Sequence, residues 1–113
     1  ISIDKISSHH VFQAYEEGDP LAVAVIDKAI KYWGMAIANL VSIFNPEKVI
    51  LGGGVFGPAN QFLDRISKEA KKWAQPISFK ELTLETSALQ TDSGLIGAGY
   101  LAIKTIKDAH HVK

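Results

Sequence analysis

The sequence of 113 residues contains no cysteine, and its 12 lysine and arginine residues balance its 12 aspartate and glutamate residues. Without cysteine the chain has no disulfide, no thiolate ligand for zinc and no cysteine nucleophile. A formal net charge of zero gives no electrostatic attraction to a phosphate backbone or to an anionic membrane. We therefore expect this segment to bind neither nucleic acid nor membranes.

Long apolar runs are also missing. The longest, Met35 to Phe44, is interrupted by Asn39 and Ser42 and is about half the length of a membrane span. The sequence starts at Ile1 without the basic and apolar regions of a signal peptide, so we expect a cytoplasmic protein and a fragment of a longer chain. Hydrophobic residues make up 47% of the sequence, enough for one modest core and therefore one domain or part of one.

The first half of the chain predicts two helices. Gly18-Asp19-Pro20 separates a short helix, from about Ser8 to Glu17, from a long helix that runs from Pro20 to about Phe44. Beyond Trp33 the long helix is apolar nearly all round, so we expect cover from two sides and close backbone approach at Gly34. One apolar stripe of this helix consists of Ile26, Ile30, Trp33, Ile37, Val41 and Phe44.

The second half predicts two strands, each followed by a helix. Lys48 to Leu51 has the pattern of a buried parallel strand, and residues 77–86 contain a second strand with Leu82 and Leu84 on one face. A helix from Pro58 to about Ala74 lies between them, and a last helix, capped by Asp92 or Ser93, runs to about Lys107 before a tail that starts at His110. This order is that of an α/β protein, but two strands make too small a sheet for a complete one. The inward side chains of the middle helix are expected to be Phe62, Leu63, Ile66, Ala70 and Trp73.

The candidate site is the turn Gly52-Gly53-Gly54-Val55-Phe56-Gly57, which follows the first strand. Successive glycines let a ligand approach main-chain atoms, and the helix that follows aims free amides in the same direction, as phosphate or ribose requires. Ligands of open α/β sheets lie at the carboxyl ends of the strands, where this turn is expected. The pattern indicates a nucleotide site; a turn that only reverses the chain is the alternative.

These six residues also spell the G-x-G-x-x-G string of dinucleotide-binding proteins. That fingerprint requires an acidic residue at the end of the next strand, about 20 residues further on. The next predicted strand ends near Glu85, 28 residues after Gly57, so a Rossmann oxidoreductase is the weaker interpretation.

Three segments resemble motifs of one family. The run from Asn45 to Val55, NPEKVILGGGV, resembles the adenosine motif of the ROK family (repressors, open reading frames and sugar kinases). The run from Tyr15 to Ala22 resembles that family's A-x-x-G-D-x-x-A step, and the run from Gly94 to Ala98 resembles its closing G-L-x-G-A helix. The motifs occur in the family's order and span nearly all of the chain.

The resemblance implies an ATP-dependent hexose kinase, similar to glucokinase or fructokinase, that uses Mg2+ and is commonly a homodimer. Residues 1–113 would be the carboxy-terminal part of its nucleotide-side lobe, a partial actin-like ATPase (ribonuclease H-like) α/β fold. The residues expected against the adenosine and inner phosphate are Gly52, Gly53 and Gly54, with Val55 and Phe56 nearby.

Other motifs of the family are not in this sequence: the D-x-G-x-T phosphate loop, the catalytic Asp, the sugar-binding E-x-G-H segment and the C-x-C-G-x-x-G-C zinc cluster. We therefore expect no catalytic residue and no metal ligand here; sugar and zinc would be bound by the missing portion. His9-His10 and His110-His111 lack a third ligand, and Ser93 is expected to cap a helix rather than act as a nucleophile. A sugar-responsive repressor of the same family stays open as an alternative.

Overall fold

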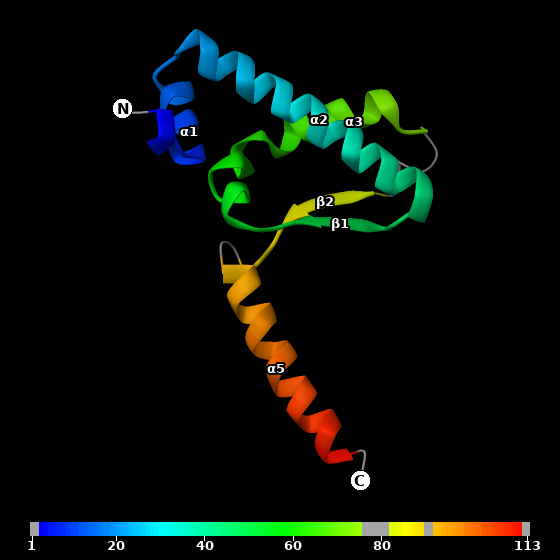
Figure 1. Cartoon of the computed structure of the whole chain (residues 1–113). Helices are drawn as coiled ribbons and strands as arrows, with labels where there is room; N and C mark the ends of the chain where they lie inside the picture. The colour runs from blue at the N-terminus through cyan, green and yellow to red at the C-terminus, as the bar shows by residue number, and fades with distance from the viewer. Residues whose placement is uncertain (1–2, 76–81, 90–91, 112–113) are drawn as a thin grey trace.

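The computed structural model describes residues 3–75, 82–89 and 92–111 (Figure 1). The predicted order of helix, helix, strand, helix, strand, helix is confirmed, and the bounds of the long helix and the first strand agree with the sequence prediction. The elements are α1 (Ser8–Glu16), α2 (Pro20–Phe44), β1 (Lys48–Leu51), α3 (Leu63–Trp73), β2 (Thr83–Thr86) and α5 (Ser93–His111), with short 3-10 helices η1 (Ile3–Lys5), η2 (Gly54–Phe56) and η3 (Pro58–Phe62).

The junction between α1 and α2 forms as its residue types predict. Gly18 takes a φ of 80°, which glycine adopts without a steric penalty. Asp19 Oδ1 then accepts hydrogen bonds from the backbone nitrogens of Leu21, at 2.9 Å, and Ala22, at 3.1 Å, and so caps α2. At the other end of α2, Asn45 is left-handed, with a φ of 45°, and closes the helix.

The hydrophobic core lies between α2 and α3 and extends to α1. The ring of Phe62 stacks with that of Phe12 and meets the edge of Tyr15, which joins α1 to the start of α3. The helices α2 and α3 approach most tightly at Gly34, as predicted. The buried core side chains are Phe12, Ile26, Ile30, Ile37, Ala38, Val41, Ala59, Phe62, Ile66, Ala70 and Ala74.

Two expectations about aromatic side chains were wrong. Phe44, at the end of the predicted apolar stripe, is 71% exposed, and Trp73 is 52% exposed. Phe44 is the last residue of α2, and the Trp73 indole lies on the outer side of α3, where its nitrogen donates to the Glu69 carboxylate at 3.4 Å. Leu40 and Ile43 are exposed among the described residues, so the described chain itself does not supply the predicted cover of α2 from two sides.

The sheet consists, in the described ranges, of β1 and β2, which pair in parallel from Lys48 opposite Thr83 to Leu51 opposite Thr86. Leu82 and Leu84 both pack against the core, so their predicted common face is confirmed. Ile50 is 61% exposed, so the prediction of a fully buried strand was wrong. Burial alternates along β1 because the core covers one face of the sheet. The first half of the predicted second strand, residues 77–81, lies outside the described residues.

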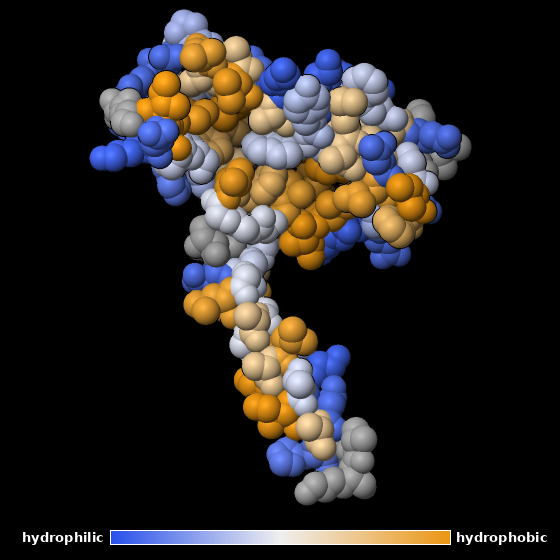
Figure 2. All heavy atoms as spheres, in the orientation of Figure 1, coloured by the Kyte–Doolittle hydropathy of each residue, from blue (hydrophilic) through white to orange (hydrophobic). Residues whose placement is uncertain are grey.

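The last helix, α5, projects away from the rest of the molecule (Figure 1). The radius of gyration is consequently 17.9 Å, whereas a compact chain of this length has about 13 Å. The helix runs to His111, so the expectation of a tail from His110 was wrong; no glycine or proline interrupts it after Gly99. Apolar side chains line it (Figure 2), and those exposed are Leu95, Ile96, Tyr100, Leu101, Ile103 and Ile106. No described helix combines the length and apolarity that crossing a membrane requires.

Candidate functional site

The glycine turn, residues 52–57, begins where β1 ends. The backbone nitrogen of Ser87 donates a hydrogen bond of 2.7 Å to the carbonyl of Leu51, so the segment after β2 lies beside the start of the turn. Because β1 and β2 are parallel, their carboxyl ends share this edge of the sheet. The turn therefore has the position that ligands of α/β sheets occupy.

The backbone of the turn explains one of its glycines and leaves another unexplained. Gly53 has a φ of 93° and a ψ of 173°, a conformation that is essentially restricted to glycine. Gly54 has no left-handed φ, and a Cβ added there would meet no atom within 4 Å. Neither backbone conformation nor contact with the described chain thus requires glycine at position 54, whereas close approach of a ligand would.

The amides after the glycines are in part already bonded within the turn. The chain continues into η2 and η3, and α3 begins only at Leu63. The backbone nitrogens of Phe56 and Gly57 already donate, at 3.2 and 3.4 Å, to the carbonyls of Gly53 and Gly54. The helix predicted from Pro58 is thus present, but its first turn is the 3-10 helix η3, and at least these two amides are not free to bind a phosphate. A further 3-10 segment, η2, lies between Gly53 and this helix.

The same geometry argues against a Rossmann site. In that fingerprint the glycines open an α-helix directly, which they do not do here. The acidic residue near the end of the next strand, Glu85, forms an ion pair of 3.3 Å with Lys48 of the neighbouring strand. Its carboxylate is thus engaged across the sheet.

Val55 and Phe56 differ in their exposure to solvent. Val55 is 40% exposed, whereas Phe56 is half-buried and packs against the core. The Phe56 ring lies against Trp33 of α2, with ring centroids 5.1 Å apart and an interplanar angle of 52°. Of the five predicted site residues, Phe56 therefore anchors the turn to α2.

Two serines near the turn were missed by the sequence prediction of the site. The Ser93 hydroxyl donates a hydrogen bond of 3.0 Å to Oγ of Ser87. A Cβ added at Gly52 would lie 3.4 Å from both the Ser87 Cβ and the Ser93 Oγ. The signal available in the sequence was the parallel pairing itself, because it brings the residue after the second strand beside the residue after the first.

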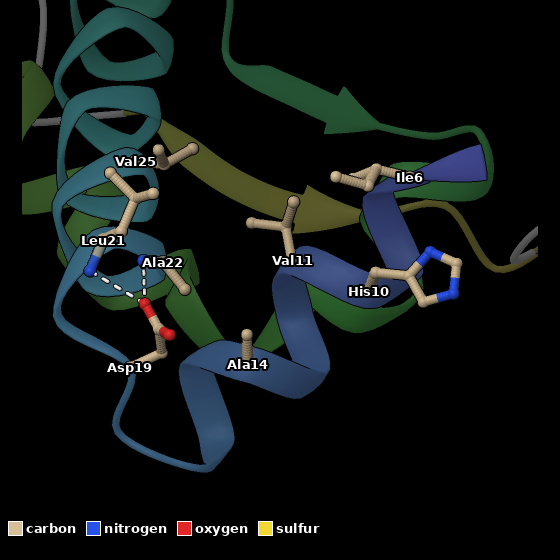
Figure 3. Close-up of a pocket in the computed structure, with 8 residues that line it drawn as sticks. All are labelled: Ile6, His10, Val11, Ala14, Asp19, Leu21, Ala22 and Val25. Atoms are coloured by element: carbon tan, nitrogen blue, oxygen red, sulfur yellow. Dashed lines mark hydrogen bonds between the residues drawn. The ribbon is translucent and has the colours of Figure 1, made fainter. Parts of the chain in front are cut away.

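Two grooves of the described surface lie away from the glycine turn. A groove of ≈ 330 Å³ between α1 and the start of α2 is mostly apolar (Figure 3). Its carboxylate, Asp19, is engaged in capping α2. The groove is lined by Ile6, His10, Val11, Ala14, Asp19, Leu21, Ala22 and Val25. No residue of the glycine turn lines it, so it carries none of the predicted nucleotide contacts.

A second groove, between α2 and α3, is charged and has a volume of ≈ 380 Å³. Its carboxylates are paired: Asp27 with Arg65 at 2.7 Å, and Glu69 with Lys72 at 3.0 Å. The hydrogen bond from Lys72 lowers the pKa of Glu69, against a smaller opposing effect of desolvation. Nowhere in the described ranges do three or more His, Asp or Glu side chains form a group that could hold a metal.

Comparison with known proteins identifies the relatives of the chain. A family model described as the ROK family matches residues 2–105. The glucokinase of Halalkalibacterium halodurans is 34% identical over 96 residues, which cover 85% of this chain and 29% of that protein. The chain thus spans about a third or less of the length of the curated relatives it matches.

Solved structures agree with this result. A ROK family glucokinase from Streptomyces griseus, in complex with glucose and AMPPNP, has a TM-score of 0.74 and 32% identity, covering 88% of this chain and 32% of that one. A ROK family transcriptional regulator has a TM-score of 0.63 and 32% identity, covering 74% of this chain and 21% of that one. Sugar kinases and a regulator are therefore both similar to this chain.

Proposed function

The chain belongs to the ROK family, and from this premise we propose that it is part of an ATP-dependent hexose kinase similar to glucokinase. In this proposal the chain supplies the adenosine-binding glycine turn and not the catalytic base. The contact residues are Gly52, Gly53 and Gly54, with Val55 at the rim and Phe56 as the anchor of the turn.

The observation that carries the proposal is the open space at Gly54, at the carboxyl ends of two parallel strands. A ligand lying against Gly54 would explain this glycine; Gly94, Gly97 and Gly99 of α5 are equally open, so the position of Gly54 at the strand ends is what singles it out. Gly53 adds a second unobstructed position. Gly53 and Gly54 together expose main-chain atoms that a flat adenosine group can approach closely.

Phosphoryl transfer needs more than this surface. It requires a base that orients the sugar hydroxyl and positive charge, including Mg2+, that stabilises the transferring phosphoryl group. The glycine turn has no ionisable side chain, so its own contribution is to bind and orient the nucleotide. We assign the base, the sugar contacts and the charge on the γ-phosphate to the rest of the intact protein.

The proposal is tested by the substitution Gly54→Ala in the intact protein. The added methyl group meets no described atom, so the folded state should keep its melting temperature while the methyl intrudes on the nucleotide. We expect the KM for ATP to rise at least threefold and the KM for the hexose to change less than twofold. An unchanged KM for ATP would contradict the assignment of the turn.

A sugar-responsive transcriptional repressor is the second candidate function, and the similarity to a ROK family transcriptional regulator favours it. The two candidates differ outside this chain: a repressor needs a DNA-binding domain, and a kinase needs a phosphate loop and a catalytic Asp. Hexose-dependent ATP turnover by the intact protein supports the kinase. DNA binding that a sugar releases, without such turnover, supports the repressor.

A further inference from the structure

Three segments of the chain converge on Gly52. They are the end of β1, the residue Ser87 that follows β2, and Ser93, the first residue of α5. The hydroxyl of Ser87 accepts hydrogen bonds from Ser93 Oγ, at 3.0 Å, and from the backbone nitrogen of Leu89, at 3.2 Å. The two serines thus form a small half-buried polar cluster beside the position that a Cβ of residue 52 would occupy, and the Ser87 amide ties it to the Leu51 carbonyl at 2.7 Å.

Contacts to the glycine turn are unevenly distributed. Gly53 and Gly54 have open space where a side chain would be, so nothing in the described chain presses on them from that side. Phe56 fixes the far end of the turn against Trp33. The near end, Gly52, is the point at which the two serines meet it.

We infer that Ser93, through its hydrogen bond to Ser87, is a positioning residue that holds the near end of the glycine turn in the conformation that binds nucleotide. This inference rests on the proposed function. It also gives the start of α5 a role at the site, since the hydrogen bond ties that helix to the segment that follows β2.

The spacing at Gly52 limits which side chains can do this. A Cβ on residue 52 would lie 3.4 Å from Ser93 Oγ and from Ser87 Cβ, at the short end of ordinary contact. Both serines therefore lie beside the side-chain position of residue 52. Threonine at 93 keeps the hydroxyl, whereas alanine removes it and leaves the Ser87 hydroxyl with one partner fewer.

The first part of the test compares Ser93→Ala with Ser93→Thr in the intact protein. Loss of one hydrogen bond predicts that Ser93→Ala raises the KM for ATP about two- to tenfold. The KM for the hexose and kcat should stay within about twofold, and Ser93→Thr should restore most of the loss. The control is Ser42→Ala: Ser42 is also a helical serine, but its hydroxyl donates to the Ala38 carbonyl within α2, at 2.9 Å.

The second part uses hydrogen exchange and needs no enzymatic activity. In Ser93→Ala, the amides of Gly53, Gly54 and Val55 should exchange several times faster than in the wild type, and in Ser42→Ala at the wild-type rate. Unchanged exchange in Ser93→Ala, or the same acceleration in both variants, would overturn the positioning role. If the wild-type protein neither binds nor uses ATP, the proposed function fails, and the exchange rates still decide whether Ser93 holds the turn.

Discussion

Gly34 of α2 lies directly against Glu69 of α3. A Cβ added at Gly34 would stand 2.7 Å from the Glu69 Cβ and 2.9 Å from the backbone nitrogen of Ala70, distances that real Cβ atoms essentially never show. The backbone of α3 cannot give way without moving Ile66 and Ala70, which are fully buried against α2. The absence of a side chain at position 34 therefore sets how closely the two helices pack.

We predict that Gly34→Ala destabilises the protein by about 1–3 kcal/mol, the usual cost of forcing extra atoms into a packed interface. This is the net effect: the packing cost outweighs the roughly 1 kcal/mol that alanine would gain over glycine through its higher helix propensity. Thermal or urea denaturation of the intact protein measures the difference. The control is Gly97→Ala in α5, where the added Cβ meets no described atom and stability should not fall. Equal stability of Gly34→Ala and wild type would contradict the close approach.

The sequence predicted the local features of the fold well, because local chemistry determines them. Asp19 and Pro20 start α2 at the predicted residue, and Gly34 marks the close approach of two helices. The exposure of Phe44 and Trp73 could not be predicted, since it depends on what the neighbouring elements cover. A 3.6-residue periodicity gives the face of a helix but not the length of its interface.

The candidate site was predicted in part for a similar reason. A glycine run after a strand identifies the turn, and Gly53 has the left-handed φ that such a run allows. The 3-10 geometry after it was not predicted, because apolar spacing from Phe62 to Ala70 is compatible with a helix that starts earlier. Ser87 and Ser93 were missed because only the pairing of β1 with β2 brings them to Gly52.

Gly53 and Gly18 form a matched pair for a second prediction. Both have a positive φ, of 93° and 80°, and at both an added Cβ meets no described atom. Alanine at either position should cost backbone strain of about 1–3 kcal/mol, with the larger cost at Gly53, because its ψ of 173° lies in a region essentially restricted to glycine. Only Gly53→Ala should raise the KM for ATP, at least threefold, because only Gly53 lies in the proposed nucleotide site.

Steady-state kinetics and melting temperatures of the two intact variants check this prediction together. A loss of stability in both variants, with a rise of the KM for ATP confined to Gly53→Ala, would separate nucleotide binding from backbone strain. An equal rise of the KM for ATP in Gly18→Ala would mean that strain alone explains the effect.

A third prediction concerns the isolated chain of 113 residues. It should not phosphorylate hexoses, because the glycine turn, for which we propose only nucleotide binding, carries no base and no charge for the γ-phosphate. A coupled assay with ATP, Mg2+ and a panel of hexoses tests it, with the intact protein as the positive control. Turnover above the blank by the isolated chain would contradict the division of roles that we propose.

The fourth prediction follows from the apolar side chains that the chain leaves uncovered. They gather along α5 (Figure 2) and at the end of α2, where Leu40, Ile43 and Phe44 are exposed. At roughly 25 cal/mol per Å2, a few hundred Å2 of apolar surface left in water forfeits several kcal/mol, which is comparable with the whole stability of a small domain.

We therefore expect the isolated chain to self-associate, or to fold stably only together with the rest of the intact protein. Light scattering and thermal melts over a concentration series measure this. Self-association raises the molecular mass measured by light scattering. It also makes the melting temperature rise with protein concentration, because mass action favours the associated, folded form at high concentration. Replacing Leu95, Leu101 and Ile106 by glutamine should weaken the association, since these three side chains are among the most exposed apolar groups of α5. A monodisperse wild-type monomer with a sharp transition at every concentration would show that the exposed apolar faces need no cover.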